Sequence, residues 1–364
     1  MFVVVVAAVA ACGAPSTSST SAERDSDLIG GVATTSAELD AVGAIILEGS
    51  LNSGYGTEKS VLCSGTLIAP RLVLTAKHCA VRDPEQPNDP EQFYLDTNPI
   101  YFAIGADARS PKRMVRAESV ETCGIAHTGW MGLGCDVAVY HLTESIDDVR
   151  PLQVAKTSVG SVGEAMSVVG FGVQDQDATT GSASNGKRKS GSLTVRSVHG
   201  SPLEKIFPTF DAFVGAMEAA GVSRDESVLP ALHALYDRTL LDDYEIYATS
   251  ADVQTCVGDS GGPLLGKVDG QLVVQGVVSG GLSGKSLRCP LGTVFAVFGP
   301  KAQELTTHAF ADPCGGLPAV GRCLGRLAVR CANPGEGPRK VLRTDCSVVN
   351  ATCWLFPTSQ CTHP

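Results

Sequence analysis

The chain has 364 residues, of which 43% are apolar and 5% aromatic, and its formal net charge is −10. This composition is globular and excludes an intrinsically disordered chain. The one compact basic run, GKRK at 186–189, lies in a Gly/Ser-rich stretch. We interpret it as a solvated loop tip and expect no nucleic-acid binding.

The first twelve residues, MFVVVVAAVAAC, form an apolar run that is too short to span a bilayer, which needs about 20 residues. VAAC resembles the lipobox of bacterial lipoproteins, so Cys12 is expected to be lipidated and to anchor the chain to a membrane. Residues 13–27 would then be a tether or propeptide. The alternative is a plain secretory signal with an incidental cysteine; no charged n-region precedes the apolar run, and a start further upstream stays open.

Residues 28–310 are expected to form one β-rich domain. Short runs such as GAIILEG (43–49), DVAVYHL (136–142) and QLVVQGVVSG (271–280) are rich in Val, Ile, Leu and Phe, and turn residues separate them. Many short strands without alternating helices predict antiparallel barrels or a sandwich.

Residues 202–248 break this pattern. Two helices are predicted, at about 209–220 and 225–241, because apolar residues recur there at helical spacing. These residues are Phe210, Phe213, Val214 and Met217 in the first, and Leu232, Leu235 and Tyr236 in the second. A helical hairpin with one buried face is our interpretation, and a regulatory lid is the alternative.

Thirteen cysteines are present, and twelve remain when Cys12 is set aside, an even number that suits an oxidising compartment. Residues 314–364 hold Cys314, Cys323, Cys331, Cys346, Cys353 and Cys361. So short a segment needs disulfides to fold; zinc is the alternative, although no CxxC pair or histidine cluster supports it. The pairing stays open, as does the role of this segment as a stabilising cap or an adhesion module.

Three segments carry the residue types of nucleophilic catalysis. A serine hydroxyl needs a base to remove its proton, and the base needs a group that holds its tautomer. Ser260 lies in the glycine-rich stretch TCVGDSGGPLL (255–265), which suits neither a helix nor a regular strand. His78 follows an apolar strand in LTAKHC, and Asp136 opens another in CDVAVYHL.

LTAKHC, DVAVYHL and GDSGGPLL resemble the three signature segments of the chymotrypsin/trypsin-like serine proteases, in that family's order. The resemblance covers roughly residues 28–310. It implies an all-β fold of two antiparallel six-stranded Greek-key β-barrels, here with a helical insertion and a small disulfide-rich C-terminal domain. It also implies an exported serine endopeptidase, without cofactor or metal, that cleaves proteins or peptides through an acyl-enzyme. The alternative is a latent or pseudo-protease that binds partners at the cell surface.

The resemblance assigns further residues. The backbone N–H groups of Gly258 and Ser260 would form the oxyanion hole. The disulfides implied are Cys63–Cys79 beside the histidine and Cys256–Cys289 beside the pocket. Cys123 and Cys135 have no counterpart in the family, and their position before Asp136 suggests a local bridge.

The substrate pocket is assigned to Gln254, Ser279, Gly281 and Gly292. Gln254, six residues before Ser260, would form the base of the pocket, and a neutral side chain there removes the charge that selects Arg or Lys. The two glycines would leave the walls open, so we expect medium or large uncharged side chains to bind.

LIGGV (28–32) resembles the activated N-terminus of the family. An unknown activating protease would cut between Asp27 and Leu28, and the new α-ammonium of Leu28 would pair with Asp259. The preceding ERDSD is acidic where the family has a basic residue, so a trypsin-like activator is not expected. The product would be an outer-membrane or cell-surface lipoprotein, or a secreted protein after processing.

Overall fold

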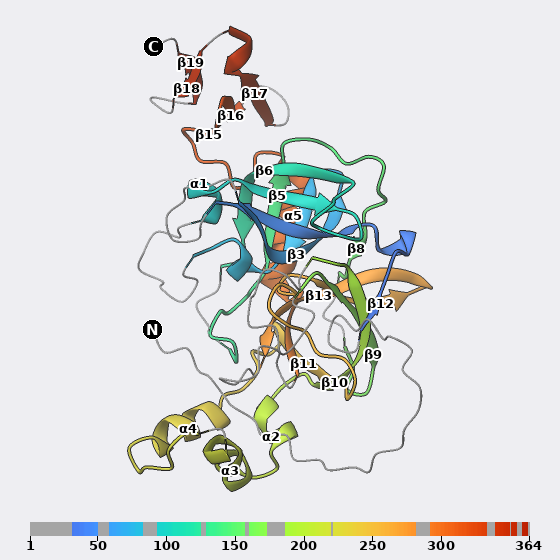
Figure 1. The fold of residues 1–364 in the computed structure, drawn as a ribbon, viewed down its shortest axis with the longest axis vertical. Coiled ribbons are helices and arrows are strands. Elements are labelled where there is room, and N and C mark those ends of the chain that lie inside the picture. The colour runs from blue at the N-terminus through green and yellow to red at the C-terminus, as the bar shows by residue number, and fades with distance from the viewer. Residues whose placement is uncertain are drawn as a thin grey trace.

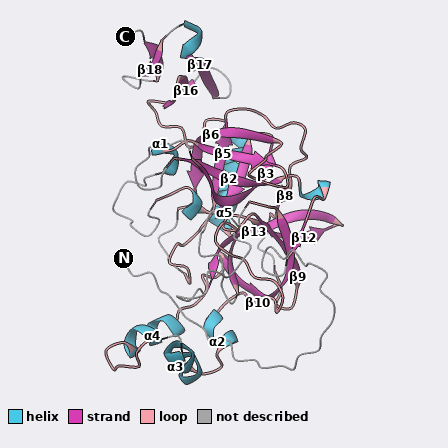
Figure 2. Ribbon diagram, viewed as in Figure 1, coloured by secondary structure: helices cyan, strands magenta, loops and turns pink. Residues whose placement is uncertain are grey.

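The computed structural model describes residues 31–49, 58–82, 93–124, 129–156, 160–172, 186–219, 221–281, 292–332, 339–349, 351–354 and 359–362. Figures 1 and 2 show two β-barrels side by side, with a helical segment beyond one barrel and a small strand-rich segment beyond the other. Among the described residues, no helix has the length and apolar character that crossing a membrane requires.

The first barrel is closed by six antiparallel strands in the order β2-β3-β4-β7-β6-β5. They are β2 (Val42–Glu48), β3 (Lys59–Ala69), β4 (Leu72–Thr75), β5 (Ile100–Ile104), β6 (Arg113–Thr122) and β7 (Ala138–Leu142). Ile45, Leu67 and Phe102 are buried in its core. The 3-10 turn η2 (Lys77–Cys79) follows β4, and the short helix α1 (Tyr94–Thr97) precedes β5.

The second barrel also contains six antiparallel strands. They are β9 (Ala165–Gly170), β10 (Lys189–Ser197), β11 (Glu245–Thr249), β12 (Pro263–Val268), β13 (Gln271–Gly281) and β14 (Thr293–Val297). Because β9 pairs with both β10 and β12, the sheet closes on itself. Strand β1 (Val32–Ala33) joins β10, and β8 (Gln153–Val154) runs parallel to β13. The two-barrel prediction is confirmed.

Three barrel strands, β6, β11 and β12, are not among those that the sequence predicts. β6 is rich in charged residues, yet its Glu118 is fully buried because the guanidinium groups of Arg71 and Arg343 pair with it. β11 lies in residues assigned to the helical insertion, and the insertion therefore ends before Glu245.

The insertion contains α2 (Pro202–Ile206), α3 (Phe210–Ala219) and α4 (Leu229–Tyr236). The two predicted helices exist, with shorter bounds, while α2 was not predicted. Phe213, Met217 and Tyr236 pack in one apolar cluster, which agrees with a hairpin that buries one face. Helix α5 (Pro300–Ala311) was also not predicted, and it packs on β6 and β7 of the first barrel.

The C-terminal segment has two small sheets. One contains β15 (Arg322–Leu324), β16 (Leu327–Ala332) and β17 (Lys340–Asp345), and the other β18 (Thr352–Trp354) and β19 (Gln360–Thr362). The 3-10 turn η3 (Cys346–Val349) lies between β17 and β18. Its disulfides are Cys314–Cys331, Cys323–Cys353 and Cys346–Cys361. All six sulfurs are therefore in disulfides, and the zinc alternative is wrong.

The interpretation of GKRK as a solvated loop tip is wrong for its last two residues. Arg188 and Lys189 are each only 1% exposed, because β10 begins here and pairs with β1. The Arg188 guanidinium binds the chain that follows β1, including the 3-10 turn η1 (Ala37–Leu39). It donates to the carbonyls of Thr34, Ser36 and Leu39 and forms an ion pair with Asp40 at 3.0 Å.

Arg188→Ala is expected to lower the free energy of unfolding by about 3–5 kcal/mol, since it removes a fully buried guanidinium and leaves the Asp40 carboxylate and three part-buried carbonyls without their donor. Arg109→Ala is the control, because its ion pair with Asp107 is half exposed and should contribute about 1 kcal/mol or less. Urea denaturation measures both, and equal losses would contradict the assignment.

Candidate active site

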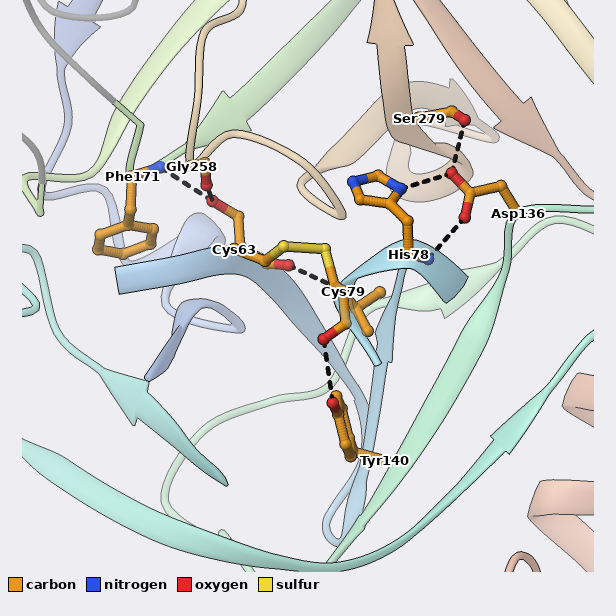
Figure 3. The surroundings of a disulfide bond; sticks show 10 residues. Cys63, His78, Cys79, Asp136, Tyr140, Phe171, Gly258 and Ser279 are labelled. Atoms are coloured by element: carbon orange, nitrogen blue, oxygen red, sulfur yellow. Dashed lines mark hydrogen bonds and ion pairs between the residues drawn. A yellow bond between two sulfur atoms is a disulfide. The ribbon is translucent and has the colours of Figure 1, made fainter. Parts of the chain in front are cut away.

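His78 and Asp136 are brought together by neighbouring strands of the first barrel. His78 lies in η2 directly after β4, Asp136 lies just before β7, and β4 pairs with β7. The carboxylate of Asp136 accepts a hydrogen bond from the backbone N–H of His78 at 2.9 Å, and its other oxygen lies 2.8 Å from His78 Nδ1 (Figure 3). This contact places the proton on Nδ1 and leaves Nε2 as the basic nitrogen.

The pair shifts the pKa values of both groups. Burial lowers the pKa of His78, but the charge and hydrogen bond of Asp136 outweigh burial and raise that pKa above 6.5. For Asp136, burial alone would raise the pKa. The charge of His78 and the hydrogen bonds from His78 and Ser279 outweigh it, so the pKa of Asp136 stays below 3.8.

Ser279 is a third member of this group, although the sequence analysis placed it in the substrate pocket. It lies in β13 of the second barrel, and its hydroxyl donates to Asp136 Oδ2 at 2.6 Å (Figure 3). Its side chain is 4% exposed, so the hydroxyl is buried against the aspartate. Ser279 lies in VVSGG (277–281), which resembles the family segment that pairs with the substrate backbone; this resemblance indicates a pocket residue but not this partner, and sequence reasoning missed the contact.

Two disulfides brace the segments that carry His78 and Asp136. Cys63 in β3 is bonded to Cys79, the residue after His78. Cys123 is bonded to Cys135, the residue before Asp136. Each bridge therefore fixes the backbone one residue from a predicted triad member.

Ser260 lies in a turn that presses against the end of β4. Its carbonyl accepts a hydrogen bond from Ser64 N–H at 2.8 Å. A Cβ atom on Gly261 would lie 2.0 Å from Thr75 Oγ1 and 2.9 Å from the backbone nitrogen of Ala76, two residues before His78. Only glycine allows this approach, which explains one glycine of GDSGG. Within the described residues, Ser260 Oγ makes no hydrogen bond to His78.

Gly258 and Ser260 present backbone N–H groups that donate to no acceptor among the described residues. Gly258 has a φ of +100°, and a Cβ atom there would lie 2.9 Å from Gly172 Cα. A side chain at Gly258 would therefore be strained and would collide with the neighbouring backbone. Two unpaired N–H groups in one turn are a suitable site for a developing oxyanion.

The side chain of Asp259, the neighbour of Ser260, is buried against Gly172 and Cys256. It is 1% exposed and accepts hydrogen bonds from Gly172 N–H and Cys256 N–H, each at 2.8 Å. Burial raises the pKa of Asp259 to about 7, although these two N–H groups oppose the shift. Among the described residues, no cationic side chain forms an ion pair with it.

The pocket residues are only partly described. Gln254 and Gly281 are half-buried. A Cβ atom on Gly292 would lie 2.3 Å from the Tyr247 hydroxyl, and the open pocket wall at Gly292 stays a prediction. Tyr247 comes from β11, a strand that the sequence analysis assigned to the insertion, and its ring occupies the space beside Gly292. Cys12, Leu28 and Cys289, with the proposed Cys256–Cys289 bridge, lie outside the described residues.

A protein-family model described as Trypsin matches residues 28–198 and 233–297, which is more than half of the chain. The matched residues include both barrels and every candidate triad, oxyanion-hole and pocket residue, while residues 199–232, with α2, α3 and the start of α4, lie between the matched stretches. The match and the two closed barrels agree, and the chain belongs to the trypsin family.

Proposed function

We propose that the protein is a serine endopeptidase in which Ser260 is the nucleophile, His78 the general base and Asp136 the group that orients His78. The observation that carries this proposal is the hydrogen-bonded set His78–Asp136–Ser279, which spans both barrels, together with the packing of the turn that holds Ser260 against Thr75 and Ala76, just before His78.

In acylation, His78 Nε2 takes the proton of Ser260 as Oγ attacks the carbonyl carbon of the peptide bond. The C=O π electrons move to oxygen, which the N–H groups of Gly258 and Ser260 stabilise at about 3 kcal/mol per donor. The intermediate collapses when His78 gives its proton to the leaving nitrogen, and an ester of Ser260 remains. Water attacks that ester with the same base, which releases the acid and restores the hydroxyl.

Asp136 supports both steps by charge and by geometry. Its carboxylate stabilises the imidazolium that forms when His78 takes a proton, which is the same interaction that raises the pKa of His78. The missing hydrogen bond between Ser260 and His78 does not oppose this mechanism, because such bonds tighten when substrate binds.

Ser260→Ala and His78→Ala should each lower peptide hydrolysis roughly 10⁶-fold and abolish labelling by a fluorophosphonate, because the triad acts as one unit. Ser347→Ala, an exposed serine of the C-terminal segment, is the control and should label normally. Failure of N-terminally processed wild-type protein to hydrolyse a peptide library or take up label would favour a pseudo-protease that acts by binding.

The proposed specificity is for uncharged side chains. Gln254 is neutral, and Tyr247, which lies beside Gly292, is neutral as well. Neither residue offers the buried negative charge that Arg or Lys would need.

Mass spectrometry of a cleaved peptide library should therefore show no enrichment of Arg or Lys before the scissile bond. Gln254→Asp should raise the share of basic residues there, since it adds a negative charge at the base of the pocket. A wild-type profile dominated by Arg and Lys would show that Gln254 is not the pocket residue.

We also propose that a cut between Asp27 and Leu28 activates the enzyme and releases it from a lipid anchor at Cys12. The support is Asp259, a buried carboxylate that accepts hydrogen bonds from two backbone N–H groups and forms no ion pair with a cationic side chain among the described residues. The α-ammonium of Leu28 would supply that charge and order the turn from Gly258 to Ser260. Uncut protein would then be membrane-bound and nearly inactive, and cut protein soluble and active.

Asp259→Asn should lower the activity of cut protein by a factor of about 10² to 10⁴, because breaking a buried ion pair costs about 3–5 kcal/mol. Asp252→Asn, at an exposed position nearby, is the control. N-terminal sequencing and activity assays of membrane and soluble fractions test the coupling. Full activity in membrane-bound protein that retains residues 13–27 would refute it.

A further inference from the structure

The buried carboxylate of Glu245 holds the loop of residues 129–135, which leads to Asp136. Glu245, the first residue of β11, is 1% exposed. Its Oε2 accepts hydrogen bonds from the backbone N–H groups of Trp130 at 2.7 Å and Leu241 at 2.8 Å, and its Oε1 accepts one from Met131 at 3.1 Å. A single side chain from the second barrel thus satisfies three backbone donors in two segments.

The loop is shaped to receive this carboxylate. Gly129 has a φ of +57°, and a Cβ atom there would lie 2.5 Å from Glu245 Oε2. Three residues further along, a Cβ atom on Gly132 would lie 3.4 Å from the Arg238 guanidinium, which follows α4. The loop therefore packs along the segment that joins the helical insertion to β11.

The same loop takes part in the apolar core of the insertion. Trp130 is 5% exposed and belongs to one cluster with Leu203, Phe213 and Tyr236, from α2, α3 and α4. Most of this insertion falls in the part of the chain that the trypsin-family match leaves out. The insertion is therefore packed against the chain that precedes Asp136.

The other side of the loop contacts the surroundings of Asp136. A Cβ atom on Gly280 would lie 2.2 Å from Met131 Cε, so the methionine side chain lies directly on this glycine. Ser279, the residue before Gly280, donates a hydrogen bond from its hydroxyl to Asp136. The loop itself ends at Cys135, next to Asp136, and the disulfide to Cys123 closes it.

We infer that Glu245 is a positioning residue for the predicted triad, and that through it helices α2–α4 act as a buttress that fixes Asp136 and Ser279. This inference rests on the proposed function. Glu245 and Asp136 also interact through their charges: burial raises the pKa of Glu245, its three N–H donors oppose that shift, and the charge of Asp136 adds to it. Loss of Glu245 should therefore change the electrostatics of the His78–Asp136 pair as well as its geometry.

The test compares Glu245→Gln with Glu118→Gln in the processed protein. Gln keeps the size of Glu245 but turns one acceptor into a donor that faces backbone N–H groups. Glu118 is the matched control, since it is also a fully buried glutamate, but its partners are Arg71 and Arg343, away from the insertion. The measurements are the rate of fluorophosphonate labelling, kcat, KM, and an NMR titration of the His78 imidazole.

Glu245→Gln should lower the labelling rate and kcat about tenfold with KM changed less than about twofold, because a small misplacement of the base slows the chemical step more than binding. It should also lower the pKa of His78 by about 0.5 or more, since Asp136 would support the imidazolium less well. Glu118→Gln should lose thermal stability but keep the wild-type labelling rate and His78 pKa.

The titration needs no turnover, so it separates this inference from the proposed function. If wild-type protein takes up no label, the peptidase proposal fails, and the shift of the His78 pKa still decides the role of Glu245. An unchanged His78 pKa in Glu245→Gln, or a wild-type labelling rate, overturns the inference. Met131→Ala, at a half-buried site, should shift the His78 pKa in the same direction and replaces Glu245→Gln if that variant does not fold.

Discussion

The carboxylate of Asp136 is the constraint on which the rest of the structure depends. A charge that is 1% exposed is stable only when its oxygens are paired, and the partners come from both barrels. His78 supplies two donors from the first barrel and Ser279 one from the second. The junction of the barrels is therefore organised around a buried anion, and a shift of one barrel against the other would leave that anion partly unpaired.

Close backbone contact is the second requirement of this junction. The turn at Gly258–Gly261 meets Gly172 on one side and Thr75 on the other at distances that no Cβ atom permits. Asp259 fills the space beside Gly172, so its carboxylate and the glycines form one tightly packed unit. Glycine is thus required at Gly258 because the backbone there has a positive φ, and at Gly261 because the chain lies against Thr75. These two requirements explain why the predicted nucleophile lies in an irregular segment.

Local pattern predicted most of the strands, and the resemblance of three short segments to the trypsin-like proteases implied the two barrels and the triad, because strand patterns and motifs are both properties of consecutive residues. What it missed depends on partners far away in the sequence. Glu118 looks like a surface residue until Arg71 and Arg343 are placed beside it, and Arg188 looks solvated until the chain after β1 crosses it. The contacts of Ser279 with Asp136 and of Glu245 with residues 130–131 join the two barrels, and no local spacing encodes them. Strand β6 is therefore hard to recognise from sequence, because the charge of Glu118 is neutralised only by residues that are distant in the sequence.

The helical insertion, most of which lies outside the trypsin-family match, and the C-terminal segment, which lies wholly outside it, attach to the same stretch, β6 and the loop after it. From the C-terminal side, Arg343 pairs with Glu118, the carbonyl of Gly315 accepts from the Ser119 hydroxyl at 2.7 Å, and His308 of α5 contacts Glu121. A few residues later, Trp130 enters the core of the helical insertion. The additions lie at opposite ends of the molecule (Figure 1), yet the chain between these attachments leads directly to Asp136. A loop held by Glu245 and closed by the Cys123–Cys135 disulfide leaves the aspartate little freedom to move, so the helical insertion restrains the residue on which the matched core depends, while the C-terminal segment anchors β6.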